Sequence, residues 1–310
     1  MIHTCRLCIC ALLGAASATC LVAVGCQEPA AVESLERTAV DSYRRPDPVP
    51  VFAPIISPRR YSAPFSDLSI QINGRMDEPA WSAAPWTDDF ADIEGSTRAT
   101  PLQRTRVKML WDAKYLYIAA DLAESDLWAT LKTHDEIVFQ DNDFEVFVDP
   151  DGDTREYYEI EVNAFGTIFD LYLPQPYRAA GKADHDWTAE GMRVAIHLDG
   201  TLNDSRDTDK GWQVEMAIPW TAFAPVAQPD GEPTFQRSSR PPIIGDSWRI
   251  NFSRVQWTLE KRDGSYAKVA GTPEYNWTWT PQWAIDMHLP QWWGFVTFVG
   301  PTVQKQEKSK

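Results

Sequence analysis

The sequence predicts an all-β protein, an antiparallel β-sandwich or jelly roll of about ten strands. Apolar and polar residues alternate with a period of two from residue 106 to 299, and no segment has the longer period of an extended helix. Turn-forming Asp, Gly and Pro residues separate the alternating segments. With 310 residues, 44% of them hydrophobic and 12% aromatic, the chain can build one large core.

The expected strands follow one another with short turns between them. Residues 106–111 and 115–121 predict a first hairpin around Asp112-Ala-Lys114, and 143–149 and 157–163 predict a second through Pro150-Asp-Gly-Asp153. The turn Asn163-Ala-Phe-Gly166 leads into a further strand. The remaining expected strands are 167–173, 192–198, 212–218, 248–255 and 293–299, and short helices are expected at 78–84 and 220–223.

The first 26 residues predict an export signal. Arg6 is followed by an apolar, small-residue run from Leu7 to Gly25, which is typical of a signal peptide. The run ends in Ala23-Val-Gly-Cys26, which resembles a bacterial lipobox, where cleavage before the Cys lets its thiol carry lipid. An uncleaved helical anchor is the alternative, because the run is about long enough to span a bilayer. Either interpretation predicts an exported protein, as a cell-envelope lipoprotein or a periplasmic or extracellular domain, whose membrane contact is this anchor alone.

Three further segments follow the signal. Residues 27–61 predict a Pro-rich tether, because its prolines punctuate a polar stretch without apolar periodicity. Residues 62–300 are expected to form the folded domain, and residues 301–310 a polar tail.

Charge and cysteine usage exclude several classes of function. The formal charge is −15, which argues against nucleic acid and anionic membrane surfaces as partners, since both attract Lys and Arg. All five cysteines lie within the first 26 residues. The folded part therefore has neither a disulfide, nor a thiolate metal site, nor a Cys nucleophile.

One face of the central strands is expected to be acidic. Strands 143–149, 157–163 and 167–173 are expected to share a core side, and their other side is rich in carboxylates. Like charges opposite one another destabilise a sheet, so a cation, an arginine such as Arg249 or a hydroxyl-rich ligand is expected to offset them. A solvent-facing acidic sheet is the alternative. The core side is assigned Phe144, Val146, Val148, Tyr158, Ile160, Val162, Phe169, Leu171 and Leu173, and the other side Asp143, Glu145, Tyr157, Glu159, Glu161, Asn163, Asp170 and Tyr172.

Three motifs carry a resemblance to a known family. The segments 73–81 (NGRMDEPAW), 107–118 (VKMLWDAKYLYI) and 140–149 (QDNDFEVFVD) resemble the family 9 carbohydrate-binding modules, most of all their stand-alone family 9-like members. The resemblance runs from about Ser69 to Phe298. It implies a β-sandwich that holds sugar between two aromatic rings, and that carries structural calcium. It also implies non-catalytic binding of an oligo- or polysaccharide, accessory to polysaccharide breakdown.

The resemblance also implies site residues. It places one ring at Phe139, where other members have Trp, the carboxylate at Glu145 and the amide at Asn163. The second ring is Trp277 or Trp279, and both stay open. Glu161 stands where an Arg is expected, which departs from the family's pattern for sugar specificity. Flat rings beside carboxylates and amides match the apolar faces and polar rims of sugars.

A calcium site is expected at the turn of the second hairpin. Asp149, Asp151 and Asp153 alternate around Gly152 and offer hard oxygen ligands at the spacing of calcium loops. The alternative is a plain Asp/Gly hairpin turn.

The rival function is a glycoside hydrolase. If the turn 149–153 centres the hairpin, Glu145 lies opposite Glu159 or Glu161, near the separation used by retaining glycosidases. An open sheet offers no evident pocket to raise one pKa, and the resembling family binds rather than cleaves. Binding is therefore the favoured interpretation.

Overall fold

The computed structural model describes residues 57–224 and 241–301. The predicted signal peptide, Cys26, the tether before residue 57 and the tail from residue 302 lie outside these ranges. The described residues form fourteen strands and six short 3-10 helices, without an α-helix. Of the strand pairs, β1 with β14 is parallel and the others are antiparallel. The prediction of an all-β, mainly antiparallel sandwich is confirmed, with more strands than the ten expected.

The larger sheet, here sheet A, has eight strands in the order β1-β14-β10-β5-β6-β7, with β13 paired to β10 and to β2. Strand β10 is its centre, because it pairs with β5 on one side and with both β14 and β13 on the other. The bounds are β1 Arg60–Pro64, β2 Ala91–Asp92, β5 Asp143–Asp149, β6 Tyr157–Asn163, β7 Ile168–Leu173, β10 Ser247–Gln256, β13 Tyr275–Thr278 and β14 Gly294–Val299.

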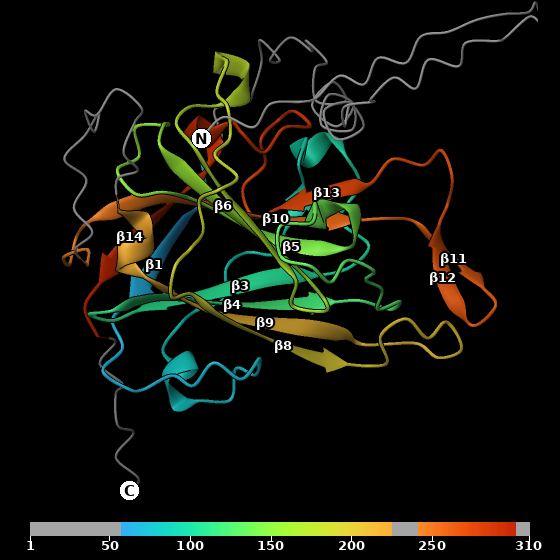
Figure 1. Cartoon of the computed structure of the whole chain (residues 1–310). Helices are drawn as coiled ribbons and strands as arrows, with labels where there is room; N and C mark the ends of the chain where they lie inside the picture. The colour runs from blue at the N-terminus through green and yellow to red at the C-terminus, as the bar shows by residue number, and fades with distance from the viewer. Residues whose placement is uncertain (1–56, 225–240, 302–310) are drawn as a thin grey trace, which may run out of the picture. The chain divides into compact units, whose positions relative to one another are not determined.

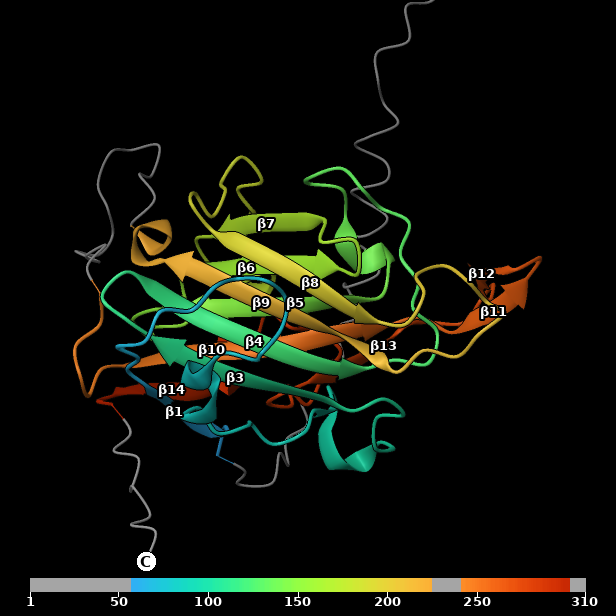
Figure 2. The same ribbon diagram turned by 90° about the horizontal axis from the view of Figure 1, so that it is seen from below.

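The second sheet, sheet B, has four strands in the order β3-β4-β9-β8. It lies across one face of sheet A, as the edge-on and face-on views show (Figures 1 and 2). A separate hairpin, β11–β12, projects from one end of the sandwich in both views. The bounds are β3 Thr105–Trp111, β4 Tyr115–Ala123, β8 Arg193–Asp199, β9 Gly211–Pro219, β11 Leu259–Arg262 and β12 Ser265–Lys268.

The 3-10 helices are short connections between strands. The expected helix at 220–223 is present as η5, whereas the one expected at 78–84 is a single 3-10 turn, η1, whose first residue is a proline. The bounds are η1 Pro79–Ser82, η2 Gly95–Thr97, η3 Val138–Gln140, η4 Tyr177–Ala179, η5 Trp220–Phe223 and η6 Pro290–Trp292. Within the described ranges, no helix is both long and apolar enough to cross a membrane.

The main core lies between the two sheets. Alternate residues of β5 and β6 point into it, as predicted, and meet the alternate residues of β4 and β9. Each of these side chains is buried, so the sandwich is held chiefly by the apolar area it removes from water. The outer face of sheet A, away from sheet B, carries a second apolar cluster that includes Phe147, Tyr157 and Trp293.

The predicted orientation of β7 is wrong. Tyr158 lies opposite Tyr172 and Ile160 opposite Asp170, and directly opposed residues point to the same side of a sheet. Tyr172 therefore joins the main core and Asp170 lies on that side, although both were assigned to the other face. Phe169, Leu171 and Leu173 were assigned to the core side, but belong to the cluster on the outer face. The cause is a turn one residue longer than assumed, because it closes with Val162 opposite Ile168.

Several boundaries also differ from the predictions. The first strand begins at Arg60, before the predicted domain start at residue 62. Segment 275–278, which none of the expected strands includes, is strand β13 and pairs with β10.

Candidate functional site

The carboxylates predicted for one face of sheet A lie together on its outer face. Glu145 of β5 is directly opposite Glu161 of β6, and Asp143 and Glu159 lie on the same side of these strands. All four side chains are at least 95% buried, so the structure does not support the alternative of a solvent-facing acidic sheet. The segments around residues 128–142 and 279–293 supply the partners that cover them, so this face is not an open acidic sheet.

Burial raises the pKa of all four carboxyls. For Glu145 loss of hydration is the largest cause, opposed by the nearby Ser253 hydroxyl and reinforced by Glu274, and it raises the pKa to about 7. Loss of hydration also dominates for Asp143, Glu159 and Glu161, and repulsion from Glu145 adds to it in each case. Each of these three pKa values lies well above the usual range for a carboxyl group.

Phe139 lies beside this cluster, as the resemblance implies. It belongs to η3, and its backbone N–H donates to Glu161 Oε2 at 2.9 Å. The ring is half-buried. The structure therefore brings Phe139 and Glu145 to the same place, through Glu161 between them.

A second half-buried ring, Trp257, lies next to Phe139. Its indole Nε1–H donates to the Phe139 carbonyl oxygen at 3.0 Å. Lys268 Nζ lies 3.5 Å from the centre of a Trp257 ring and donates to Gln140 Oε1 at 3.4 Å. The carboxyl of Glu274 is close enough to act on the pKa of both Glu145 and Lys268. We call Phe139, Gln140, Trp257 and Lys268 the aromatic site.

Sequence reasoning missed Trp257, Gln140 and Lys268. Trp257 lies two residues after the end of the strand predicted at 248–255, and Lys268 ends the β11–β12 hairpin that returns the chain to it. A tryptophan where a strand leaves its sheet is a signal that could have identified it, but only the hairpin places Lys268 over the ring.

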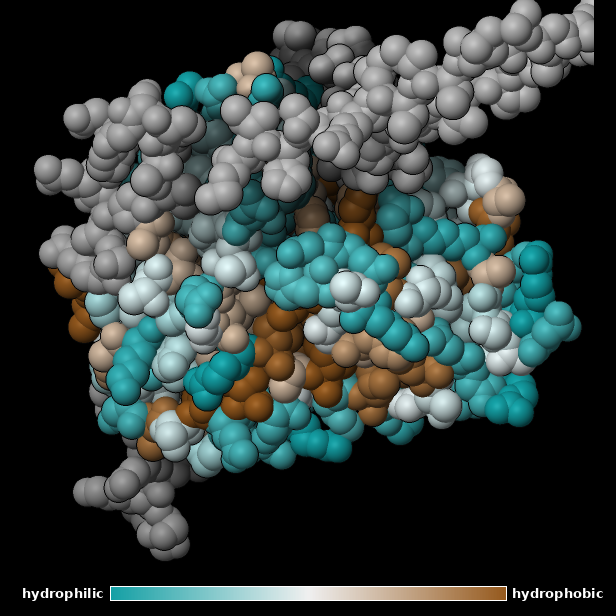
Figure 3. All heavy atoms as spheres, in the orientation of Figure 1, coloured by the Kyte–Doolittle hydropathy of each residue, from teal (hydrophilic) through white to brown (hydrophobic). Residues whose placement is uncertain are grey.

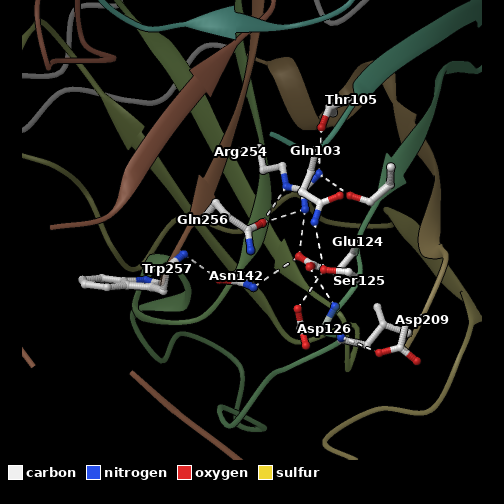
Figure 4. A network of polar contacts seen from close by, with 12 residues as sticks. Gln103, Thr105, Glu124, Ser125, Asp126, Asn142, Asp209, Arg254, Gln256 and Trp257 are labelled. Atoms are coloured by element: carbon white, nitrogen blue, oxygen red, sulfur yellow. Dashed lines mark hydrogen bonds and ion pairs between the residues drawn. The ribbon is translucent and has the colours of Figure 1, made fainter. Parts of the chain in front are cut away.

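A buried polar network fixes the backbone at Trp257 (Figure 4). The Trp257 backbone N–H donates to Asn142 Oδ1 at 2.8 Å, and Asn142 Nδ2 donates to Glu124 Oε2 at 3.4 Å. Glu124 is paired with Arg254 at 2.8 Å, and both side chains are at least 98% buried. Loss of hydration lowers the pKa of Arg254, while Glu124 opposes that shift. The aromatic site is thus built on fixed groups rather than on a free loop.

Asn163 does not face the aromatic site. Its Nδ2 donates to the Leu131 carbonyl and to Asp141 Oδ2, and its Oδ1 accepts the backbone N–H groups of Phe165 and Thr167. With both amide hydrogens and its oxygen engaged, and with no exposed surface, it holds the β6–β7 turn.

Trp277 and Trp279 are buried on the opposite side of the sheet. They are 2% and 1% exposed and belong to the main core. Trp277 is opposite Arg254 in the β10–β13 pairing, which turns its ring toward sheet B. Neither ring presents a face to a ligand in this structure, so the expectation that one of them stacks on sugar beside Glu145 has no geometric support.

The structure brings Asp149, Asp151 and Asp153 together. One carboxylate oxygen from each lies within 4.8 Å of the others, a spacing that fits the ligands of one calcium ion. Asp149 also accepts the backbone N–H groups of Gly152 and Thr154, as a hairpin turn requires. These residues could hold calcium, and calcium there stays a prediction.

The chain matches the sequence profile of one protein family. The profile is described as carbohydrate family 9 binding domain-like and matches residues 72–235, more than half of the chain.

Two curated enzymes match about half of the chain. Endo-1,4-beta-xylanase A of Thermoanaerobacterium saccharolyticum is 30% identical over 154 residues, which are 50% of this chain and 11% of the xylanase. Exoglucanase XynX of Acetivibrio thermocellus is 28% identical over 152 residues, 49% of this chain and 12% of that protein. The matched part of this chain therefore covers about a tenth of the length of these relatives.

Two solved structures are also similar. A proposed carbohydrate-binding protein from Bacteroides uniformis aligns with a TM-score of 0.55 at 16% identity, over 78% of this chain and 100% of that one, and shares its fold. A family 9 carbohydrate-binding module from Caldicellulosiruptor kristjanssonii, in complex with cellotriose, aligns with a TM-score of 0.48 at 14% identity, over 81% of this chain and 100% of that one.

Proposed function

The chain belongs to the carbohydrate family 9 binding domain-like family, and from that membership we propose that it binds an oligo- or polysaccharide without cleaving it. The ligand contacts the aromatic site. Glu161 accepts the Phe139 backbone N–H, and Glu145 lies opposite Glu161 on the neighbouring strand. The fold is that of a carbohydrate-binding module, and the position of the ligand on it is our proposal.

The observation that carries this proposal is the pairing of Phe139 with Trp257. The indole N–H of Trp257 donates to the backbone carbonyl of Phe139. The two half-buried residues are flanked by an amide, an ammonium group and carboxylates. Aromatic rings suit the C–H faces of a sugar, and the polar groups suit its hydroxyls. A few placed polar groups beside aromatic surface are the usual composition of a small-ligand site.

Binding is favoured over hydrolysis by the direction of the pKa shifts. A glycosidase needs one carboxyl held protonated and another held ionised, so the environment must move their pKa values apart. Here burial raises the pKa of Glu145, Glu159 and Glu161 together. Catalysis by Glu145 with Glu159 or Glu161 remains the alternative that the experiment below includes.

The ligand class is proposed from the two curated relatives. One is an endo-1,4-beta-xylanase and the other an exoglucanase, and the matched segment is a small part of each. A segment of that kind suits an accessory role in polysaccharide breakdown. Fragments of xylan and cellulose are therefore the first ligands to test.

We also propose that the protein is exported and tethered by lipid at Cys26. The support is the apolar run from Leu7 to Gly25 before that cysteine. Labelled palmitate should enter the wild-type protein and not Cys26→Ser. Equal labelling of the two would contradict lipid attachment at this residue.

The binding proposal is tested with a glycan array that contains xylan and cellulose oligosaccharides. We expect binding to at least one of these sugars, and Glu145→Gln should lower the affinity without any sugar release. A second assay follows release of a chromophore from the matching aryl glycosides. Release by the wild type that Glu145→Gln abolishes would replace the binding proposal with the hydrolase.

A further inference from the structure

Four side chains form a row across the outer face of sheet A. Thr278 of β13 is opposite Ser253 of β10, Ser253 is opposite Glu145 of β5, and Glu145 is opposite Glu161 of β6. Directly opposed residues point to the same side, so the row presents two hydroxyls and two carboxyls on the outer face. Asp143 lies two residues before Glu145 on the same side of β5.

The carboxylates at this place converge. One oxygen each from Asp143, Glu145 and Glu161 lies within 4.8 Å of the other two. Other oxygens of the group are already engaged, since Asp143 Oδ1 accepts the Val255 N–H at 3.0 Å and Glu161 Oε2 accepts the Phe139 N–H at 2.9 Å. The backbone therefore fixes two of the three carboxyl groups.

Three buried oxygens in and beside this row lack a partner. Asp143 Oδ2 has no hydrogen-bond partner among the described residues, and neither do the hydroxyls of Ser253 and Thr278. All three side chains are completely buried. Leaving a buried polar atom unpaired is unfavourable, so a cation that takes Asp143 Oδ2 and the Ser253 hydroxyl as ligands would remove that cost.

The cluster also lacks a basic neighbour that pairs with it. Within the described part of the chain, no Lys, Arg or His forms an ion pair with Asp143, Glu145 or Glu161. The nearby Arg254 is paired with Glu124, and His288 faces Glu159. Buried like charges need a cation or protons to offset them.

We propose that Asp143, Glu145 and Glu161 bind a calcium ion on the outer face of sheet A, with the hydroxyl of Ser253 beside it. The donors are all oxygen, which selects a hard cation. Calcium accepts carboxylates in one- or two-oxygen contacts with flexible geometry, whereas magnesium requires a near-ideal octahedron. This site is separate from the Asp149–Asp153 turn and does not depend on sugar binding.

The test uses calorimetry of the full chain after treatment with a chelator, titrated with calcium chloride alone. Asp151→Asn is introduced first, so that the hairpin turn does not contribute. This variant should still bind one calcium ion, and adding Glu161→Gln should weaken binding at least tenfold. The matched control is Glu159→Gln, the same change two residues along the same face, which should keep the stoichiometry.

A thermal melt distinguishes loss of the ion from loss of the fold. Calcium should raise the melting temperature of Asp151→Asn and not that of Asp151→Asn with Glu161→Gln, because an ion bound to the native state stabilises it. Asp143→Asn, which keeps the oxygen bonded to Val255, should behave like Glu161→Gln. The proposal is overturned if Asp151→Asn binds no calcium, or if both added substitutions leave its calcium affinity unchanged.

Discussion

Arg254 and Glu124 form a charged pair between the two sheets. Arg254 donates to Glu124, to Gln256, to the Thr105 hydroxyl and to the Ala123 carbonyl, so its guanidinium is extensively hydrogen-bonded. Burying two charges has a large hydration cost that their attraction roughly offsets. The pair is therefore a weak source of net stability, but removing one partner leaves the other charge buried alone.

Arg254→Met should lower the free energy of unfolding by about 3–5 kcal/mol, because Glu124 loses its counter-charge. The surface pair Arg206–Asp204 is the control, and Arg206→Met should change the free energy of unfolding far less, because solvent screens the pair. Urea unfolding of both variants measures the difference. Equal stabilities would mean that Glu124 finds water or another partner when Arg254 is removed.

At the scale of elements, the β6–β7 turn depends on Asn163. Its amide links the turn to Leu131 and Asp141, in the segment that covers the outer face of sheet A. The turn length sets the register of β7, which decides that Tyr172 enters the core.

Asn163→Ala should lower the free energy of unfolding by about 3 kcal/mol, because buried backbone groups lose their partners. Chemical denaturation measures this loss, and Ala164→Gly, beside it in the same turn, is the control. The resemblance to the family instead implies an amide that contacts sugar. Normal stability of Asn163→Ala together with lost sugar binding would favour that role.

A segment near the chain's end covers the other part of the same face. Met287 and Trp293 pack on Phe147 and Tyr157, and His288 Nδ1 lies 3.0 Å from the Tyr157 hydroxyl. Burial lowers the pKa of His288 to about 4, against the opposing effect of Asp286. Glu159 at 3.8 Å and the ring of Tyr177 also face it.

Because His288 is neutral in the fold, the unfolded chain binds the extra proton between pH 6.5 and about 4. The stability from this residue is present above pH 6.5 and is lost as the pH falls toward 4. The loss should be on the order of 3 kcal/mol and should be absent in His288→Gln. Unfolding curves of both proteins across this pH range test it, and parallel pH profiles would contradict it.

The sequence predicts strands better than it predicts which side chains are exposed and can contact a ligand. Alternation identified nine strands and the inward faces of β5 and β6, because these strands have one buried face in the main core. It failed for β7, whose register depends on one residue in a turn. It also failed for β13, a short strand that local alternation does not distinguish from a loop.

The sequence has the same difficulty with the sugar site, because exposure of a side chain depends on distant parts of the chain. The sequence does not distinguish Trp257 from Trp277 as a ligand-binding ring. Only the pairing of β13 with β10 turns Trp277 into the core. The structure places Phe139 near Glu145, through Glu161, and their role in sugar binding stays a prediction from the resemblance to the family. Burial of the carboxylates was missed, because the segments that cover them come from distant parts of the chain.

At the scale of the whole molecule, sheet A separates two environments. One face builds the main core with sheet B, and the other carries the carboxylates, the second apolar cluster and, at its edge, the aromatic site. The molecular surface mixes hydrophilic and hydrophobic areas on the face shown in Figure 3, so exposed apolar area alone does not identify a binding site. We therefore assign the sugar site from the aromatic and polar side chains that lie together at the aromatic site.

The most direct test of sugar binding at the aromatic site is calorimetry with the best oligosaccharide from the array. Trp257→Ala should weaken binding at least tenfold, since removing a central ring costs about 1–3 kcal/mol. Trp86→Ala is the matched control, because Trp86 is also half-buried, under the guanidinium of Arg106 and close to Lys108, but contacts sheet B. We predict wild-type affinity for Trp86→Ala and a loss for Trp257→Ala. Equal affinities of the two variants would contradict a sugar site at Phe139 and Trp257.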